Sequence, residues 1–173
     1  MKNLFLLLAG CQILMSASSA ALGKEVTIWS AQSRQCQPDS NASNDLIYGG
    51  WVFRPGRTRT ARLVCPVTRL DFFPNTGIDS VGFSATVKDT DGIGTSASIE
   101  VCLMRKNHMT ARSEKLSCVF SNDNSSRGVV QLEADHLNLG SMNQWAHYFT
   151  VRMSRNGTAE QVNLHSLRIW LKG

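Results

Sequence analysis

Four of the five cysteines in this 173-residue chain lie beyond its first 21 residues, and they constrain its fold more than any other feature. Residues 1–21 have the order of a secretory signal: Lys2, then an apolar stretch, then a run of small residues that a signal peptidase can cut. An even number of cysteines on an exported chain predicts disulfides, because the compartment beyond the membrane is oxidising. We therefore predict a signal peptide over 1–21 and a single disulfide-bonded domain over 22–173.

The leader allows a second interpretation. Leu8-Ala9-Gly10-Cys11 is similar to the lipobox of bacterial lipoproteins, in which the cysteine is acylated. The apolar stretch before Cys11 is at the short edge of the usual range, whereas an apolar stretch running on to Met15 fits cleavage after Ala20 or Ala21. We predict a secreted or periplasmic protein, with a lipid anchor through Cys11 as the alternative. No other apolar stretch approaches the roughly 20 residues that cross a bilayer, so we expect no transmembrane segment.

The four remaining cysteines allow three pairings. Cys102 and Cys118 fall within successive predicted strands joined by residues 106–112, so a bridge across that hairpin is geometrically easy. Cys36 then pairs with Cys65, and this pairing is favoured because it closes the two shortest sequential loops. Zinc is not expected, because the chain has no Cys-x-x-Cys spacing and its compartment oxidises thiols.

Period-two alternation of apolar residues predicts β-strands over 81–88, 97–103 and 145–153. The alternation changes phase within 162–171, which a bulge near His165-Ser166 would explain. A short helix is conceivable only over 131–142, where Gly140 would end it. Turn signals separate further strand candidates at 26–30, 46–53, 59–65, 69–73, 116–121 and 128–133. Many short strands with such turns predict an all-β fold, a single antiparallel two-sheet β-sandwich of jelly-roll or Greek-key type.

A set of short segments, spread over most of the exported chain, can be compared with known proteins. The segments are Cys36, Gly49-Gly50, Arg62-Leu63-Val64-Cys65-Pro66-Val67, Val87-Lys88-Asp89, Val101-Cys102-Leu103, Tyr148-Phe149-Thr150-Val151 and Leu167-Arg168-Ile169-Trp170. The set resembles a loose group of small secreted bacterial proteins. In that group an early cysteine, a Cys-Pro pair and a later strand cysteine punctuate a β-sandwich. The resemblance implies an exported, disulfide-bonded, all-β protein, and it implies no activity.

A run of arginines is the first candidate binding feature: Arg54, Arg57, Arg59 and Arg62. On an extended strand Arg57 and Arg59 project to one side, and guanidinium groups suit phosphate or sulfate. A solvated edge that discourages sheet-to-sheet aggregation explains the same residues without a ligand. The chain has 18 Lys and Arg against 13 Asp and Glu, and this modest excess disfavours nucleic acid as a partner.

The four tryptophans are the second candidate feature, because exposed aromatic rings stack on sugars. Trp51 and Trp145 have apolar neighbours and are expected in the core. Trp170 alternates with Leu167, Ile169 and Leu171, so we expect it to face outward, and Trp29 is only partly in phase with its apolar neighbours.

The sequence gives weaker support for a metal site or a catalytic site. Asp89-Thr90-Asp91-Gly92 begins like a calcium loop but lacks its later ligands, and an Asx-type turn explains the same residues. We expect His108 and His136 in exposed loops and His147 as a half-buried, hydrogen-bonded ring. No nucleophile motif occurs, and no metal or cofactor is predicted.

The sequence thus favours an exported non-catalytic binding protein that acts at or outside the bacterial cell envelope, on a polysaccharide or an acidic envelope polymer. Its predicted binding residues are the four arginines of the run and Trp170. The alternative is a structural or protein-interaction module with a protein partner, and the third hypothesis is a small secreted hydrolase of unrecognised type.

Overall fold

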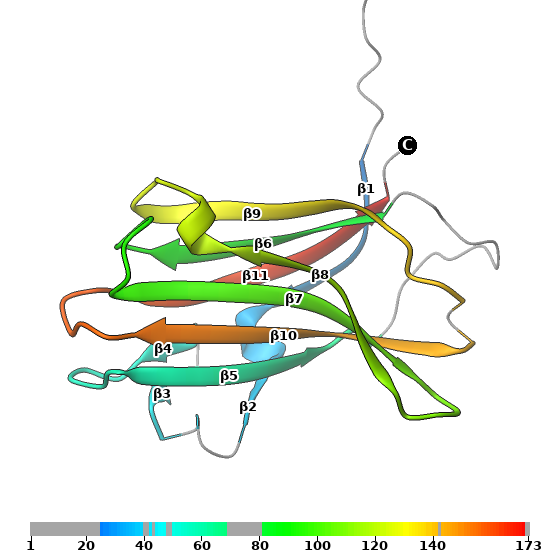
Figure 1. The fold of residues 1–173 in the computed structure, drawn as a ribbon, viewed down its shortest axis with the longest axis horizontal. Coiled ribbons are helices and arrows are strands. Elements are labelled where there is room, and N and C mark those ends of the chain that lie inside the picture. Colours follow the sequence, from blue (N-terminus) through cyan, green and yellow to red (C-terminus); the bar gives the residue numbers. More distant parts are fainter. Residues whose placement is uncertain are drawn as a thin grey trace, which may run out of the picture.

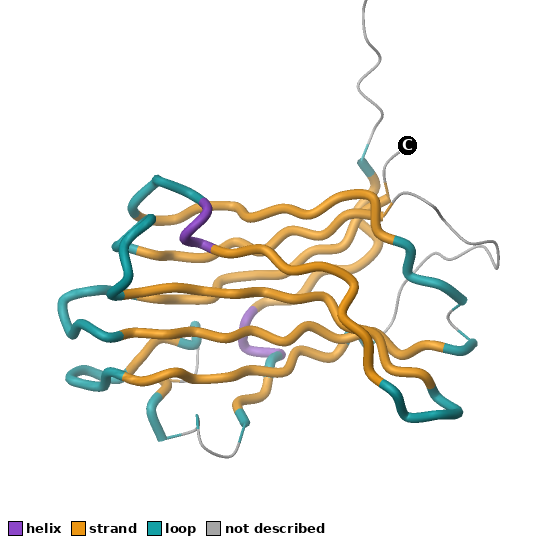
Figure 2. Tube along the Cα trace, in the orientation of Figure 1, coloured by secondary structure: helices purple, strands orange, loops and turns teal. Residues whose placement is uncertain are grey.

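The computed structural model describes residues 25–39, 42, 44–47, 50–68, 81–141 and 143–171, and their secondary structure is almost entirely β-strand. The expected leader 1–21, including Cys11, and the expected strand 69–73 lie outside these residues. The elements, shown in Figures 1 and 2, are β1 Val26–Gln32, η1 Ser33–Gln35, β2 Gln37–Pro38, β3 Leu46–Ile47, β4 Val52–Phe53, β5 Arg59–Pro66, β6 Val81–Asp89, β7 Ala97–Asn107, β8 Ser113–Phe120, η2 Ser121–Asp123, β9 Gly128–Leu137, β10 Trp145–Arg155 and β11 Val162–Leu171.

The strands form two antiparallel sheets that pack face to face, so the predicted β-sandwich is confirmed (Figure 1). One sheet has the order β3-β4-β11-β6-β9, with β1 also paired to β11, and is called here the six-stranded sheet. The five-stranded sheet has the order β2-β5-β10-β7-β8. From β8 onward the chain alternates between the sheets, β9 and β11 joining the first and β10 the second. No described helix is long and apolar enough to cross a membrane.

The core is built by the predicted alternation. Val81, Phe83, Ala85 and Val87 on β6 are at most 1% exposed, and their counterparts on β7 and β10 are equally buried. The Phe149 ring on β10 joins the two layers, because it stacks on Trp29 at 5.6 Å and meets Phe83 edge-on at 5.3 Å. Burial of this kind stabilises by about 25 cal/mol per Å² of apolar surface, so the core determines which residues face inward.

The phase change in the last strand is also confirmed. The pairing of β11 with β6 shifts between Leu164 and Ser166, which makes His165 the extra residue of a bulge. Leu164 and Leu167 therefore both face the core, with 0% and 1% exposure.

Two local expectations were wrong. The described residues 131–141 contain no helix, because Val130 and Leu132 are buried at period two and β9 pairs with β6 over its length. The single strand expected over 46–53 is two short strands, β3 and β4, and Trp51 between them has a left-handed φ of 35°.

Both disulfides join the predicted partners. Cys36–Cys65 lies in the core, where the two residues are 2% and 0% exposed, and it ties the segment before β2 to β5. Cys102–Cys118 joins directly opposed residues of β7 and β8 on the outer face of the five-stranded sheet.

We predict that the core disulfide contributes more to stability than the surface one. The chain-entropy model assigns about 3.6 kcal/mol to the Cys36–Cys65 loop and about 3.1 kcal/mol to the shorter Cys102–Cys118 loop. Loss of the buried sulfurs adds a cavity cost in the first case. Urea unfolding of the C36A/C65A and C102A/C118A double variants measures the difference, and equal midpoints would contradict it.

Candidate functional site

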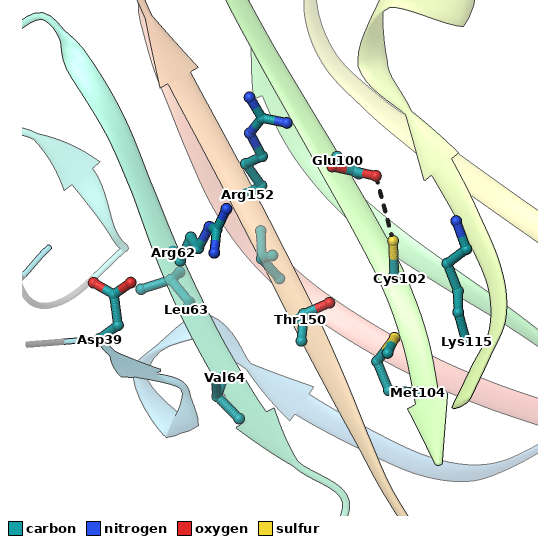
Figure 3. A pocket seen from close by; sticks show the side chains of 11 residues that line it. Asp39, Arg62, Leu63, Val64, Glu100, Cys102, Met104, Lys115, Thr150 and Arg152 are labelled. Atoms are coloured by element: carbon teal, nitrogen blue, oxygen red, sulfur yellow. Dashed lines mark hydrogen bonds between the residues drawn. The ribbon is translucent and has the colours of Figure 1, made fainter. Parts of the chain in front are cut away.

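A shallow depression of about 430 Å³ lies on the outer face of the five-stranded sheet (Figure 3). Most of the lining side chains alternate along the strands with residues held in the core, and the core residues Leu63 and Val151 contribute to its floor. Its lining comes from the residue after β2 and from β5, β10, β7 and β8: Asp39, Arg62, Leu63, Val64, Glu100, Cys102, Met104, Lys115, Thr150, Val151 and Arg152.

Five of the outward residues form one line across the sheet, which we call the charged row: Asp39, Arg62, Arg152, Glu100 and Phe120. The backbone N–H of Asp39 donates to the Arg62 carbonyl at 3.0 Å. Arg62 then opposes Arg152, which opposes Glu100, which opposes Phe120. Since neighbouring strands lie about 4.8 Å apart, Asp39 and Glu100 are separated by about 14 Å of sheet.

The two arginines of the charged row oppose each other on adjacent strands (Figure 3). Among the described residues neither guanidinium forms an ion pair. Like charges directly opposite each other across a sheet are destabilising. Glu100, which opposes Arg152 on its other side, offsets this repulsion in part. An anion between Arg62 and Arg152 would reduce it further and use guanidinium N–H groups that form no ion pair among the described residues.

The carboxylates that border the arginines have other neighbours. Asp39 Oδ1 accepts a hydrogen bond from the Ala42 N–H at 2.9 Å. Glu100 Oε1 lies 3.6 Å from Cys102 Sγ, the contact drawn dashed in Figure 3. Because that sulfur is bonded to Cys118 and has no proton, it donates no hydrogen bond to Glu100. For the same reason Glu100, Cys102 and Cys118 are no metal site while the disulfide is formed, although their ligand atoms lie within 4.8 Å of one another.

The predicted arginine run does not form one stripe. Only Arg62 lies in the depression. Arg57 and Arg59 stand together, as expected, but beside the buried carboxylate of Asp45, at 3.8 and 3.9 Å. Arg54 is exposed, and its carbonyl accepts a hydrogen bond from Arg155 at 2.9 Å.

The expectation that Trp170 is exposed was wrong. Its side chain does belong to the outer face of the six-stranded sheet, yet only 1% of it is accessible. A Cβ on the opposing Gly82 would come within 2.5 Å of the indole Cε2, so the ring lies against a position that has no side chain. The Arg168 guanidinium covers the ring at 4.8 Å from its centroid. Trp170 therefore offers no surface for stacking.

The other tryptophans are also covered. Trp29 and Trp51 are 8% and 5% exposed, and the half-buried Trp145 lies under the Arg105 guanidinium at 4.2 Å. The exposed ring beside the depression is instead Phe120, at 42%. Its alternation with the buried Val119 is the sequence signal that marks Phe120 as facing outward.

The Asp89–Asp91 segment forms the Asx-type turn that was the expected alternative to calcium. Asp89 Oδ1 accepts the Asp91 N–H at 2.9 Å, and its other oxygen accepts the Ser121 hydroxyl at 2.5 Å. Asp91 accepts backbone N–H groups of Ser96 and Ala97. Protein donors therefore account for these carboxylates.

His147 is a buried, hydrogen-bonded ring, close to the prediction. It is 4% exposed, and its Nε2 lies 2.9 Å from the Leu139 carbonyl oxygen, which makes Nε2 the protonated nitrogen. Burial lowers the pKa of His147 below 6.5, and the charges of Arg105 and His108 lower it further against the opposing effect of the Leu139 hydrogen bond. His108 and His136 are exposed, the latter within β9 rather than a loop.

No protein-family model and no curated protein matches the sequence. Solved structures that are similar to the fold include the following three. The xylan-binding module CBM15 matches over 86% of this chain and 97% of its own, with 15% identity and a TM-score of 0.47. The CBM22-1 and GH10 modules of a Clostridium thermocellum endo-1,4-beta-D-xylanase, complexed with xylohexaose, match over 86% of this chain and 29% of theirs, with 11% identity and a TM-score of 0.49. TmCBM61 in complex with beta-1,4-galactotriose matches over 83% and 88%, with 9% identity and a TM-score of 0.42.

This chain therefore spans less than a third of the xylanase chain. With every identity at 15% or lower and every TM-score below 0.5, these similarities assign no function to it.

We predict that Gly82→Ala destabilises the protein by about 1–3 kcal/mol, because the new methyl group displaces the Trp170 indole. Gly50→Ala is the matched control, since its Cβ would meet nothing within 4 Å. Urea unfolding followed by tryptophan fluorescence measures both, and equal effects of the two substitutions would contradict the packing described.

The lowered pKa of His147 makes stability pH-dependent in one direction. Above about pH 6.5 the His147 ring is neutral in both the folded and the unfolded protein, so its full contribution to the free energy of unfolding is present. Below that pH the unfolded chain binds a proton that the folded protein does not, and stability falls as the pH falls. We expect the urea midpoint to decrease less between pH 7.5 and pH 5 in His147→Gln than in the unsubstituted protein.

Proposed function

We propose that this protein is an exported, non-catalytic binding protein that acts at or outside the cell envelope and holds an acidic polysaccharide on the outer face of the five-stranded sheet. The observation that carries the proposal is the opposed pair Arg62 and Arg152, which have no ion-pair partner among the described residues. Two disulfides suit an oxidising compartment.

The surroundings of the pair fit a sugar chain. The Thr150 hydroxyl donates and accepts hydrogen bonds, and Val64 and Met104 offer apolar contact to the C–H faces of a pyranose. Val64 is 43% exposed and Phe120 42%, so the face has accessible apolar surface beside its charges. A guanidinium binds a carboxylate or sulfate through two parallel N–H groups, which gives both affinity and orientation.

Titration calorimetry of the oxidised protein with acidic polysaccharides tests the proposal. We expect R62Q and R152Q each to weaken binding about tenfold, because each removes a charge-assisted hydrogen bond. R127Q removes the same charge from an exposed loop before β9 and is the matched control. Binding should also weaken with added salt, since exposed charges are screened.

Two outcomes would contradict the proposal. Equal affinity of R62Q, R152Q and R127Q would move the ligand away from this face. Absence of binding to every polysaccharide, with retained folding, would favour a structural or protein-docking module instead.

A further inference from the structure

A second depression, of about 310 Å³, lies where the edge strand of one sheet meets the edge strand of the other. The strands are β8 and β9, and the lining residues are Cys118, Val119, Phe120, Asp123, Asn124, Gln131, Leu132 and Glu133. Phe120 also ends the charged row, where it opposes Glu100. The edge depression is therefore continuous with the charged row across one exposed aromatic ring.

The edge depression has the chemistry of a site for a neutral sugar. Its polar side chains are amides and carboxylates, and no lysine or arginine is among its lining residues. Gln131 Nε2 donates to Glu133 Oε1 at 2.5 Å, which leaves the other Glu133 oxygen to accept from a sugar hydroxyl. The Phe120 ring supplies a face on which a pyranose can stack. An anion would instead meet the negative charges of Asp123 and Glu133.

Positive charge in the charged row is confined to its centre. Arg62 and Arg152 occupy adjacent strands, about 4.8 Å apart, while Asp39 closes the row on one side and Glu100 on the other. A polysaccharide chain that lies along the charged row with an acid group on every sugar would bring one group against Asp39 and another against Glu100, and Lys115 is the one further cation that lines the depression. A chain with one acid group can place that group on the two arginines.

We infer that the ligand is a polysaccharide in which isolated acid sugars are separated by neutral ones, lying across the strands from β5 to the edge formed by β8 and β9. The acid sugar sits on Arg62 and Arg152, and a neutral sugar stacks on Phe120 in the edge depression. This inference rests on the proposed function and narrows it, because it excludes densely charged polymers as the preferred ligand.

Polymers with one backbone and graded charge density test the inference. Homogalacturonans of graded methyl esterification form one series and carboxymethylcelluloses of graded substitution form another. We expect the affinity of the oxidised protein to be highest at low charge density, about threefold or more above both the uncharged and the fully charged member. Affinity that rises steadily with charge would overturn the inference and leave the proposed function standing. No binding to either series would overturn the inference, and the proposed function would fall with it if every polysaccharide in the calorimetric test also failed to bind.

Two substitutions locate the effect. E100Q keeps an acceptor oxygen but removes the charge, so we expect affinity for the fully charged member to rise about threefold while binding to the sparsely charged member stays within twofold. F120A should weaken binding to the sparsely charged member about tenfold through lost stacking. V129A, at a position on β9 that is 63% exposed, is the control for loss of exposed apolar surface. An F120A protein that binds as tightly as V129A would remove the edge depression from the ligand path.

Discussion

The register of β10 between β5 and β7 is the constraint on which the binding face depends. Phe149, Val151 and Met153 are at most 1% exposed, so moving any of them outward would expose core surface. A slip by one residue would exchange the two faces of the strand. It would then place Arg152 and Thr150 in the core, at the cost of burying an unpaired charge. Apolar packing therefore fixes the position of charged residues that take no part in it.

The ends of that face are set by covalent bonds. β2 has only two residues and pairs with β5 over Gln37 and Pro38. The Cys36–Cys65 bond lies just before it and holds this short edge in place, and with it Asp39. At the other side Cys102–Cys118 joins β7 to the edge strand β8 two residues before Phe120. β2 and β8 are the two edge strands of the five-stranded sheet, and each disulfide adds a covalent link at one of these edges.

Features that depend on neighbours in the chain were predictable from the sequence. Alternation predicted β6, β7 and β10, the phase change predicted the bulge in β11, and loop length predicted both cysteine pairs. The binding face depends on distant residues instead. Arg62 meets Arg152 only through sheet register, whereas its neighbours in sequence, Arg57 and Arg59, turn to Asp45. Their spacing along the sequence therefore does not show that Arg62 lies in the depression while Arg57 and Arg59 lie beside Asp45.

The contact between Gly82 and Trp170 has a consequence for divergence of the sequence. The indole occupies the volume that any side chain at position 82 would need, although the two positions are far apart along the chain. A larger residue at 82 therefore strains the fold unless position 170 becomes smaller. In proteins that share this sandwich, substitutions at 82 and 170 should accordingly be correlated.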